Sequence, residues 1–495
     1  MTQIKYIALV CMLFLVTACQ KYLVKAPLDS VNTVNFFQTP QDAISAINSA
    51  YQPLQWPKLY NLRMWATDIM AGNSVVGAGG GTDGIETVQE ANFVTDPSNP
   101  GVLDLYRGPG PGILRCNLVL ANVPGMKIDT ALKARILGEA HFLRGLYYFI
   151  LVRFFGRVPL ITQPVTAASN LYPSQAPADS VYHLIIEDLT DAMTLLPGRE
   201  AYTGADIGRA SKGSATGLLA KVYLTLGSTA ANYQKVLSLC QQVTALGYQL
   251  NVNYADNFDP AHKNSVESLF EVQYSGTTTY GFFDDLNQAS WTSTFMGPRN
   301  TNFVAGAYGW NQPTKEFADS YEPGDKRKDL TILYQGCPSF YGNAYKSSYS
   351  STGFNVRKFL VPTAVSPDYN TSPEDFVVLR YADVLLMEAE AFNQLGRTNE
   401  ALAPLNLVRQ RAGLPDVQPG LSQSAFRDTI LHERRMELAF EGQRWFDLIR
   451  VDNGQYALNF FHSIGKTNFT GKFLLLPVPQ EEIDANPNLK QNPGY

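Results

Sequence analysis

A segment without helical periodicity gathers aromatic and amide side chains that could bind a polar ligand. It spans residues 251–374 and is rich in Gly, Ser, Thr and Asn. Flat aromatic faces beside amide and guanidinium donors suit sugars, which offer C–H faces and many hydroxyls, and they suit peptides too. The candidate ligand contacts in this segment are Tyr280, Phe282, Asn287, Trp291, Arg299, Tyr308 and Trp310. An earlier irregular region adds two weaker candidates, Trp65 and Asn73.

The same aromatic residues have a plainer interpretation. Trp and Tyr are highly buried on average, so loop aromatics often serve only to pack loops onto a domain. A long segment without helix is typically either functional or poorly ordered, and the density of aromatics here favours order. Ligand contact and loop packing are therefore both open at this point.

Motifs of common catalytic and metal sites are incomplete in this sequence. His432-Glu433 begins like the zinc motif H-E-x-x-H, but the second histidine is absent. Residues 79–84 satisfy G-x-G-x-x-G only as letters, because no adequate strand precedes them. Asp284 and Asp285 cannot form a glycosidase pair together, since neighbours in an extended chain face opposite ways. We predict a protein that is not an enzyme and that has no metal or cofactor.

The N-terminus has the three parts of an export signal. Lys5 precedes the apolar run Ile7–Val16, and the small residues Thr17 and Ala18 lead to Cys19. This arrangement resembles the bacterial lipobox, in which the cysteine is acylated and becomes the first residue. We predict a signal peptide over residues 1–18 and a lipidated tether over 19–35. Several acyl chains on one terminus would anchor the protein stably to a membrane.

Composition describes an ordinary globular chain. The 495 residues are 45% hydrophobic and 17% charged, and the formal net charge is −5. Lys and Arg are scattered, which argues against nucleic acid as a partner. Cys116, Cys240 and Cys337 remain after the export signal, far apart and odd in number. Buried free thiols are the simplest expectation for them.

Helical periodicity dominates the remaining chain. Residues 138–155 are apolar on most faces, and Arg144 and Arg153 interrupt them well short of the roughly 20 residues that a membrane span needs. The pattern predicts a buried core helix ended by Gly156. Helices are also predicted over 39–54, 113–120 and 179–196. Between residues 60 and 112, and in particular over Gly108–Gly112, Gly and Pro predict loops.

Two helix pairs predict a repeat-like scaffold. Residues 214–226 with 233–246, and 381–395 with 399–411, share the spacing of small and apolar positions typical of tetratricopeptide repeats. Stacked pairs bury faces that one pair cannot bury alone, so three or four pairs are expected. A final helix is predicted over 425–450, and its charged run from His432 to Glu437 is interpreted as ion pairs around packed aromatics.

Five motifs resemble the SusD/RagB family of outer-membrane nutrient-binding lipoproteins. They are the lipobox with Cys19–Asp29, the stretches Ala140–Phe149 and Phe155–Leu160, Arg380–Glu390, Glu433–Gly442 with Arg444–Arg450, and the closing Leu476–Pro479 with Asn492–Tyr495. The resemblance implies a mostly α-helical fold, in which tetratricopeptide-like helix pairs form the scaffold and a loop-rich, partly β elaboration is added. The run Gly108–Gly112 departs from the pattern expected there.

The resemblance also implies a function. It implies non-catalytic binding of an oligosaccharide, or sometimes a peptide, at the cell surface, and partnership with a TonB-dependent, SusC-like outer-membrane barrel. The rivals are a glycoside hydrolase and a scaffold for a protein partner. The expected organisation is an N-terminal helical region over 36–250, the ligand-binding elaboration over 251–374 and a C-terminal helical region over 375–495, with the two helical regions in one compact unit.

Overall fold

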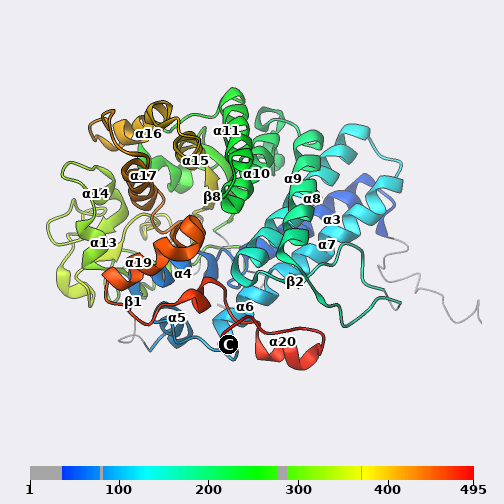
Figure 1. Cartoon of the computed structure of the whole chain (residues 1–495), viewed down its shortest axis with the longest axis horizontal. Helices are drawn as coiled ribbons and strands as arrows, with labels where there is room; N and C mark the ends of the chain where they lie inside the picture. Colours follow the sequence, from blue (N-terminus) through cyan, green and yellow to red (C-terminus); the bar gives the residue numbers. More distant parts are fainter. Residues whose placement is uncertain (1–35, 78–81, 167, 277–286, 370) are drawn as a thin grey trace, which may run out of the picture.

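The computed structural model describes residues 36–77, 82–166, 168–276, 287–369 and 371–495, and helices dominate them (Figure 1). Cys19, Tyr280, Phe282, Asp284 and Asp285 lie outside the described residues. The longer helices are α3 (Pro40–Tyr51), α7 (Pro109–Asn122), α8 (Thr130–Phe155), α9 (Ala178–Leu195), α10 (Lys212–Leu226), α11 (Ala230–Ala245), α15 (Tyr381–Gln394), α16 (Thr398–Ala412), α17 (Gln423–Glu437) and α19 (Gln455–Ser463).

Helix α8 confirms the predicted core helix and begins earlier than expected. The Asp129 carboxylate caps it by accepting a hydrogen bond from the Leu132 amide at 2.8 Å, and Gly156, with φ +67°, ends it. Its two interior arginines are buried by different means. Arg144 forms an ion pair with Asp188 at 2.7 Å. Arg153 lies over the rings of Phe149 and Phe446, and burial lowers the pKa of its guanidinium to about 10.

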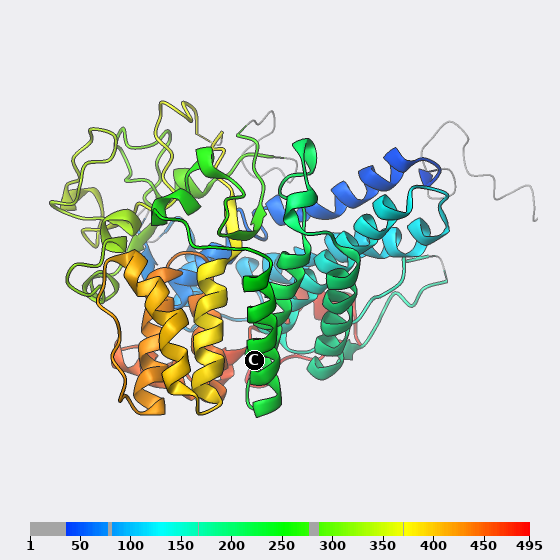
Figure 2. The same ribbon diagram turned by 90° about the horizontal axis from the view of Figure 1, so that it is seen from above.

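Consecutive helices pack side by side across the molecule. Helix α8 packs on α7 and α9, α10 on α9 and α11, and α11 on α15, which in turn packs on α16 and α17. Figure 2 shows this row of helices from orange through green to blue, with the yellow-green loops of residues 251–374 along one side of it. The predicted fold of stacked helix pairs with a loop-rich elaboration is confirmed.

The expectation of a loop over Gly108–Gly112 is wrong. Helix α6 (Pro100–Arg107) ends at Gly108, and α7 begins at Pro109, where the missing amide of proline is tolerated. A Cβ atom on Gly112 would lie 2.1 Å from the Tyr147 ring. Glycine is therefore required because α7 and α8 approach closely at this point, and not because the chain turns.

The region from residue 60 to residue 107 also contains helices that the periodicity did not predict. They are α4 (Arg63–Met70) and α5 (Ile85–Ala91), besides α6. Every residue of α4 is buried, including Arg63, Thr67 and Asp68, so the polar residues of this short helix do not mark a side that faces water.

The predicted helix over 425–450 is broken into α17 and α18 (Arg444–Arg450). Phe440 and Gly442 have positive φ angles of 64° and 69° in the connection. Their amides donate to the buried Asp68 carboxylate at 3.1 and 2.9 Å. A Cβ atom on Gly442 would lie 2.6 Å from the Met64 carbonyl oxygen. A carboxylate more than 300 residues distant in sequence thus stabilises the break.

The charged run of α17 forms the predicted ion pairs, in a buried network. Glu437 pairs with Arg380 at 2.5 Å, with Arg327 at 2.9 Å and with Arg411. Burial opposes ionisation of Glu437, but the three guanidinium groups lower the pKa of its carboxyl. Glu433 pairs with Arg327 and Arg409, which confirms that it belongs to the scaffold.

Short strands tie the elaboration to the helices. Strand β4 (Ser268–Val272) pairs antiparallel with β8 (Phe376–Arg380), which leads directly into α15. The other pairs are β1 (Ser74–Val76) with β5 (Asn311–Pro313), β2 (Val158–Pro159) with β3 (Gln175–Ala176), and β6 (Ile332–Leu333) with β7 (Asn355–Val356). The elaboration also contains three short helices, α12 (Thr292–Met296), α13 (Lys315–Asp319) and α14 (Arg327–Thr331), and α20 (Gln480–Ala485) lies near the C-terminus. Cys116, Cys240 and Cys337 are buried free thiols, as predicted.

Candidate functional site

The pairing of β1 with β5 joins the two irregular regions that contain the predicted ligand contacts. Val76 lies opposite Asn311 in this ladder, and the Gly77 amide donates to the Trp310 carbonyl at 2.9 Å. A Cβ atom on Gly77 would lie 1.9 Å from the Gln312 amide carbon. The chain therefore needs glycine where the region after β1 meets the elaboration.

The predicted aromatic contacts from both regions form one cluster around Phe295. Ring centroids lie 5.9 Å from Phe295 to Trp65, 6.1 Å to Trp291, 5.7 Å to Trp310 and 5.4 Å to Tyr308. Trp65 and Trp310 also meet edge to face at 5.6 Å. Edge-to-face and offset contacts at these distances stabilise aromatic packing beyond the burial of their surface.

Five of the predicted contacts are buried, which revises their expected role. Trp65, Trp291, Trp310, Asn73 and Asn287 are each at most 4% exposed. The three indoles offer no free face in this conformation, so the packing interpretation describes them. The Trp310 indole N–H donates to the Asp83 carbonyl, and a Cβ atom on Gly84 would lie 2.7 Å from that indole nitrogen.

The buried amide of Asn73 has a scaffold role as well. Its Nδ2 donates to Asp68 at 2.8 Å, and its Oδ1 accepts from Arg435 at 2.9 Å. The carboxylate that stabilises the break between α17 and α18 is thereby linked to the start of β1. Asn73 therefore connects the helices to β1, the strand that supports the loops.

Tyr308 and Arg299 are the predicted contacts that reach the surface among the described residues. Tyr308 is half-buried against Phe295. The Arg299 side chain is 42% exposed and its Nη1 lies 3.0 Å from the Asp83 carboxylate, which is 48% exposed. This exposed ion pair, with the tyrosine anchored in the aromatic cluster, forms a surface that we call the loop face: Asp83, Arg299 and Tyr308. Its role in ligand contact stays a prediction.

Sequence patterns missed Asp83 and Gln312. The Gln312 side chain accepts from the amide and the hydroxyl of Ser351 at 2.9 and 2.7 Å, and donates to the Gly309 carbonyl at 2.9 Å. It thus joins three loop segments beneath the loop face. Asp83 lies within the rejected G-x-G-x-x-G match and no motif surrounds Gln312, so only their tertiary contacts identify them.

A buried carboxyl, Glu374, supports the base of the same loops. Its Oε1 accepts from the Ser293 amide at 3.0 Å and from the Ser290 hydroxyl at 2.8 Å, and its Oε2 accepts from the Ser372 hydroxyl. Burial raises the pKa of Glu374 to about 7, although these hydrogen bonds favour the ionised form. Helix α12, which contributes Phe295 to the cluster, is fixed to residues 372–374 by this side chain.

Across residues 36–495, outside the stretches that the structure leaves undescribed, no group of three or more His, Cys, Asp or Glu side chains could hold a metal ion. In the same described ranges, every helix is too short or too polar to cross a membrane.

Two family models match the chain. The model described as "SusD family" matches residues 266–495, and the one described as "Starch-binding associating with outer membrane" matches residues 22–224. Among curated relatives, the SusD-like protein P2 of Formosa agariphila is 26% identical over 493 residues, which cover 95% of each chain.

Solved structures resemble this fold over nearly its whole length. A laminarin-binding SusD-like protein superposes with a TM-score of 0.79 and 28% identity, covering 93% of this chain and all of its own. The surface glycan-binding protein A of Bacteroides thetaiotaomicron, solved with laminarihexaose, superposes with a TM-score of 0.77 and 25% identity. That alignment covers 91% of this chain and 99% of the other.

Proposed function

Because this chain belongs to the SusD/RagB family, we propose that it binds an oligosaccharide at the cell surface without cleaving it and delivers it to a TonB-dependent outer-membrane barrel. The observation that supports this most directly is the fold shared with proteins that bind laminarin and laminarihexaose. A lipid on Cys19 would hold the protein at the outer membrane. Its exposed loops would face the exterior.

The loop face is the proposed place of binding. Tyr308 is held by the buried ring of Phe295, so it can offer an aromatic surface without losing much side-chain freedom on binding. Arg299 and Asp83 offer donors and acceptors beside it, which match the hydroxyls of a sugar. Tyr280 and Phe282, which lie outside the described residues, stay proposed ligand contacts on the sequence alone.

Buried side chains hold the loops beneath the loop face in place. Buried aromatic rings, the Gln312 side chain and the Glu374 carboxyl fix the loops to the helices. A rigid support with variable loops is a physical basis for binding different ligands on one fold. The indoles predicted to stack on the ligand act in this proposal as supports for Tyr308.

Calorimetry on a soluble form without the predicted signal peptide and lipidated cysteine, residues 20–495, tests the proposal. Laminarihexaose, other neutral oligosaccharides and short peptides are titrated in turn, and each mixture is assayed afterward for cleavage. We expect an intact oligosaccharide to bind, and Tyr308→Ala to weaken that binding by roughly 1–3 kcal/mol, the range for lost aromatic stacking. Tyr172→Ala is the matched control, since Tyr172 is 51% exposed on a separate loop.

Other outcomes would redirect the proposal. Binding of peptides alone would keep the family and change the substrate class. Sustained release of shorter sugars would indicate a hydrolase. No binding by any sugar or peptide, with a protein partner still retained, would favour the scaffold alternative.

A further inference from the structure

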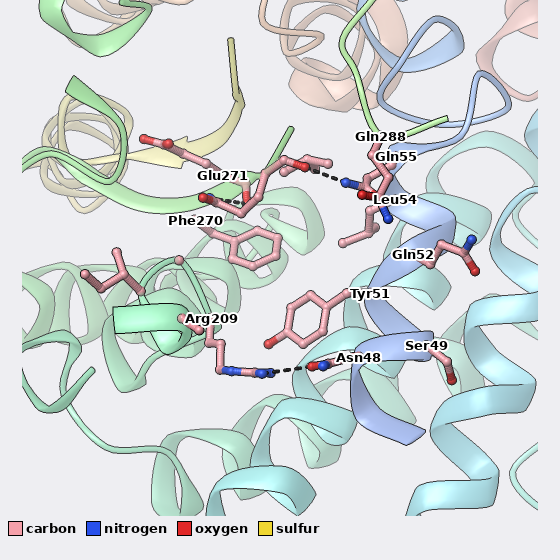
Figure 3. A pocket seen from close by; sticks show the side chains of 15 residues that line it. Asn48, Ser49, Tyr51, Gln52, Leu54, Gln55, Arg209, Phe270, Glu271 and Gln288 are labelled. Atoms are coloured by element: carbon pink, nitrogen blue, oxygen red, sulfur yellow. Dashed lines mark hydrogen bonds between the residues drawn. The ribbon is translucent and has the colours of Figure 1, made fainter. Parts of the chain in front are cut away.

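A cavity of about 400 Å³ opens beside the elaboration, outside the loop face (Figure 3). Its walls come from the end of α3 and the turn after it, from residues 205–209, from β4 and from Gln288. These segments are far apart in sequence, and the cavity exists only because β4 packs beside α3. Its volume lies within the range of small-molecule sites in proteins.

The floor of this cavity is aromatic and fixed in place. The rings of Tyr51 and Phe270 lie 6.5 Å apart, and Phe270 packs edge to face on Phe142 of α8 at 4.8 Å. The Tyr51 hydroxyl accepts from the Ala210 amide at 3.0 Å, which fixes the ring. Phe270 is buried and supports the half-buried Tyr51 ring, which does not need to rearrange when a ligand binds.

Amide side chains surround the aromatic floor. In Figure 3, Tyr51 lies between Asn48 on one side and Gln55 with Gln288 on the other. Gln55 donates to the Gln273 carbonyl at 2.7 Å, and Gln52 accepts from Arg115 at 3.0 Å. Within the described ranges, the Gln55 Oε1 has no protein partner, so it remains as an acceptor for a ligand. Gln52 points away from the Tyr51 ring, toward Arg115 (Figure 3).

The charged groups in the wall are already neutralised. Arg209 directs its three nitrogens at Asp206, Glu139 and Asn48, at 2.6, 2.9 and 2.8 Å. Burial, and then the nearby Asp375 carboxylate, raise the pKa of Glu271, which favours its neutral form. An anion would find the guanidinium occupied, and the Glu271 carboxyl favours its neutral form. The wall therefore favours an uncharged polar ligand over an anion.

We propose that this cavity is a second binding site, which takes one or two sugar units of a neutral saccharide, with the Tyr51 ring, supported by Phe270, below the sugar and the amides of Gln55 and Gln288 around it. The choice of a sugar rests on the proposed function, whereas the position of the site does not. Two sites on one chain would hold a long glycan at two points and slow its release.

Saturation-transfer NMR on residues 20–495 with laminaribiose, cellobiose and maltose as probes tests the second site. Ala205 lines the cavity and is exposed, so Ala205→Trp would fill the cavity without removing a side-chain hydrogen bond. The matched control is Ala201→Trp, because Ala201 is exposed four positions earlier and does not line the cavity. Thermal melting of both variants checks that each is folded. Gln288→Ala provides a second, smaller change at the rim.

We expect at least one disaccharide to bind. Its affinity should fall at least tenfold in Ala205→Trp and by a smaller, measurable amount in Gln288→Ala. Ala201→Trp should bind it as the unaltered chain does. Binding in Tyr308→Ala should persist. Equal binding by Ala205→Trp and Ala201→Trp, or no binding of any disaccharide, would overturn the second site. A different result would contradict the proposal for the loop face: either the hexasaccharide does not bind, or Tyr308→Ala binds it as tightly as the unaltered chain does.

Discussion

Arg380 shows how single residues stabilise this molecule through buried charge. Its guanidinium contacts Glu267, Glu437 and Glu441 at 2.8, 2.5 and 2.8 Å, and its side chain is 1% exposed. Taking charges out of water is costly, so such a network is stable only when each charge keeps its partners. The arginine joins the end of β8 to the connection after α17.

Arg380→Met should lower the free energy of unfolding by about 3–5 kcal/mol, because it leaves buried carboxylates without their partner. Urea denaturation followed by circular dichroism measures the change. Arg107→Met is the control: Arg107 forms ion pairs with Glu481 and Glu482 but is 47% exposed, and its loss should cost at most about 1 kcal/mol. Equal effects of the two substitutions would contradict the role of the network.

The raised pKa of Glu374 predicts that the stability of the protein depends on pH. The pKa of its carboxyl rises from 4.5 to about 7 on folding because it is buried. Between these two pH values the folded state keeps a proton that the unfolded state loses, so this side chain makes the protein less stable as pH rises. Glu374→Gln stays neutral and keeps an acceptor for Ser293 and Ser290.

The stability of Glu374→Gln relative to the unaltered chain should therefore increase from pH 4.5 to pH 8, by roughly 3 kcal/mol. Denaturation curves at several pH values give this difference, and other titrating groups cancel in it. A difference that is the same at pH 4.5 and pH 8 would show that folding does not raise the pKa of Glu374.

Among the elements, α7 and α8 illustrate why glycine appears where no turn exists. Gly112 is buried inside α7, and a side chain there would meet Tyr147 of α8. Gly110, two residues earlier in the same helix, has nothing within 4 Å of its would-be Cβ atom. The two glycines look alike in sequence, but only one of them is required by packing.

Gly112→Ala should destabilise the protein by about 1–3 kcal/mol through overpacking, although alanine favours a helix. Gly110→Ala should be neutral or stabilising, by up to about 1 kcal/mol. Thermal melting of both variants measures this contrast. Destabilisation of similar size by both would indicate that the chain needs glycine for its backbone conformation at these positions.

For the whole molecule, the row of helices forms the support and residues 251–374 form one side of it (Figure 2). Buried ion pairs join the helices to the elaboration, as between Glu437 of α17 and Arg327 of α14. The loop face and the second cavity both lie where the elaboration meets elements from the N-terminal half. Ligand binding is thus expected to depend on contacts between distant parts of the chain.

Membrane attachment is a property of the complete chain and is predicted from Cys19. Cys19→Ser should abolish incorporation of an alkynyl palmitate analogue, because the acylated sulfur is lost, whereas Cys11→Ser within the export signal should leave it intact. Labelling of cells that express each variant, followed by membrane fractionation, measures both. Persistent labelling of Cys19→Ser would contradict lipidation at this residue.

The sequence by itself determined the helices with a clear polar and apolar face, the start of α3 after Thr39, the end of α8 at Gly156, the paired helices and the family. These features depend on neighbouring residues, so they leave a local pattern. Only the tertiary structure decided that Trp65, Trp291 and Trp310 are buried, that α17 ends before α18, and that Gly112 lies inside a helix. Trp65 packs on Phe295 and Trp310, the break after α17 depends on Asp68, and Gly112 meets Tyr147, and each of these contacts joins residues distant in the chain. Burial by a distant partner leaves no periodic signal in the sequence.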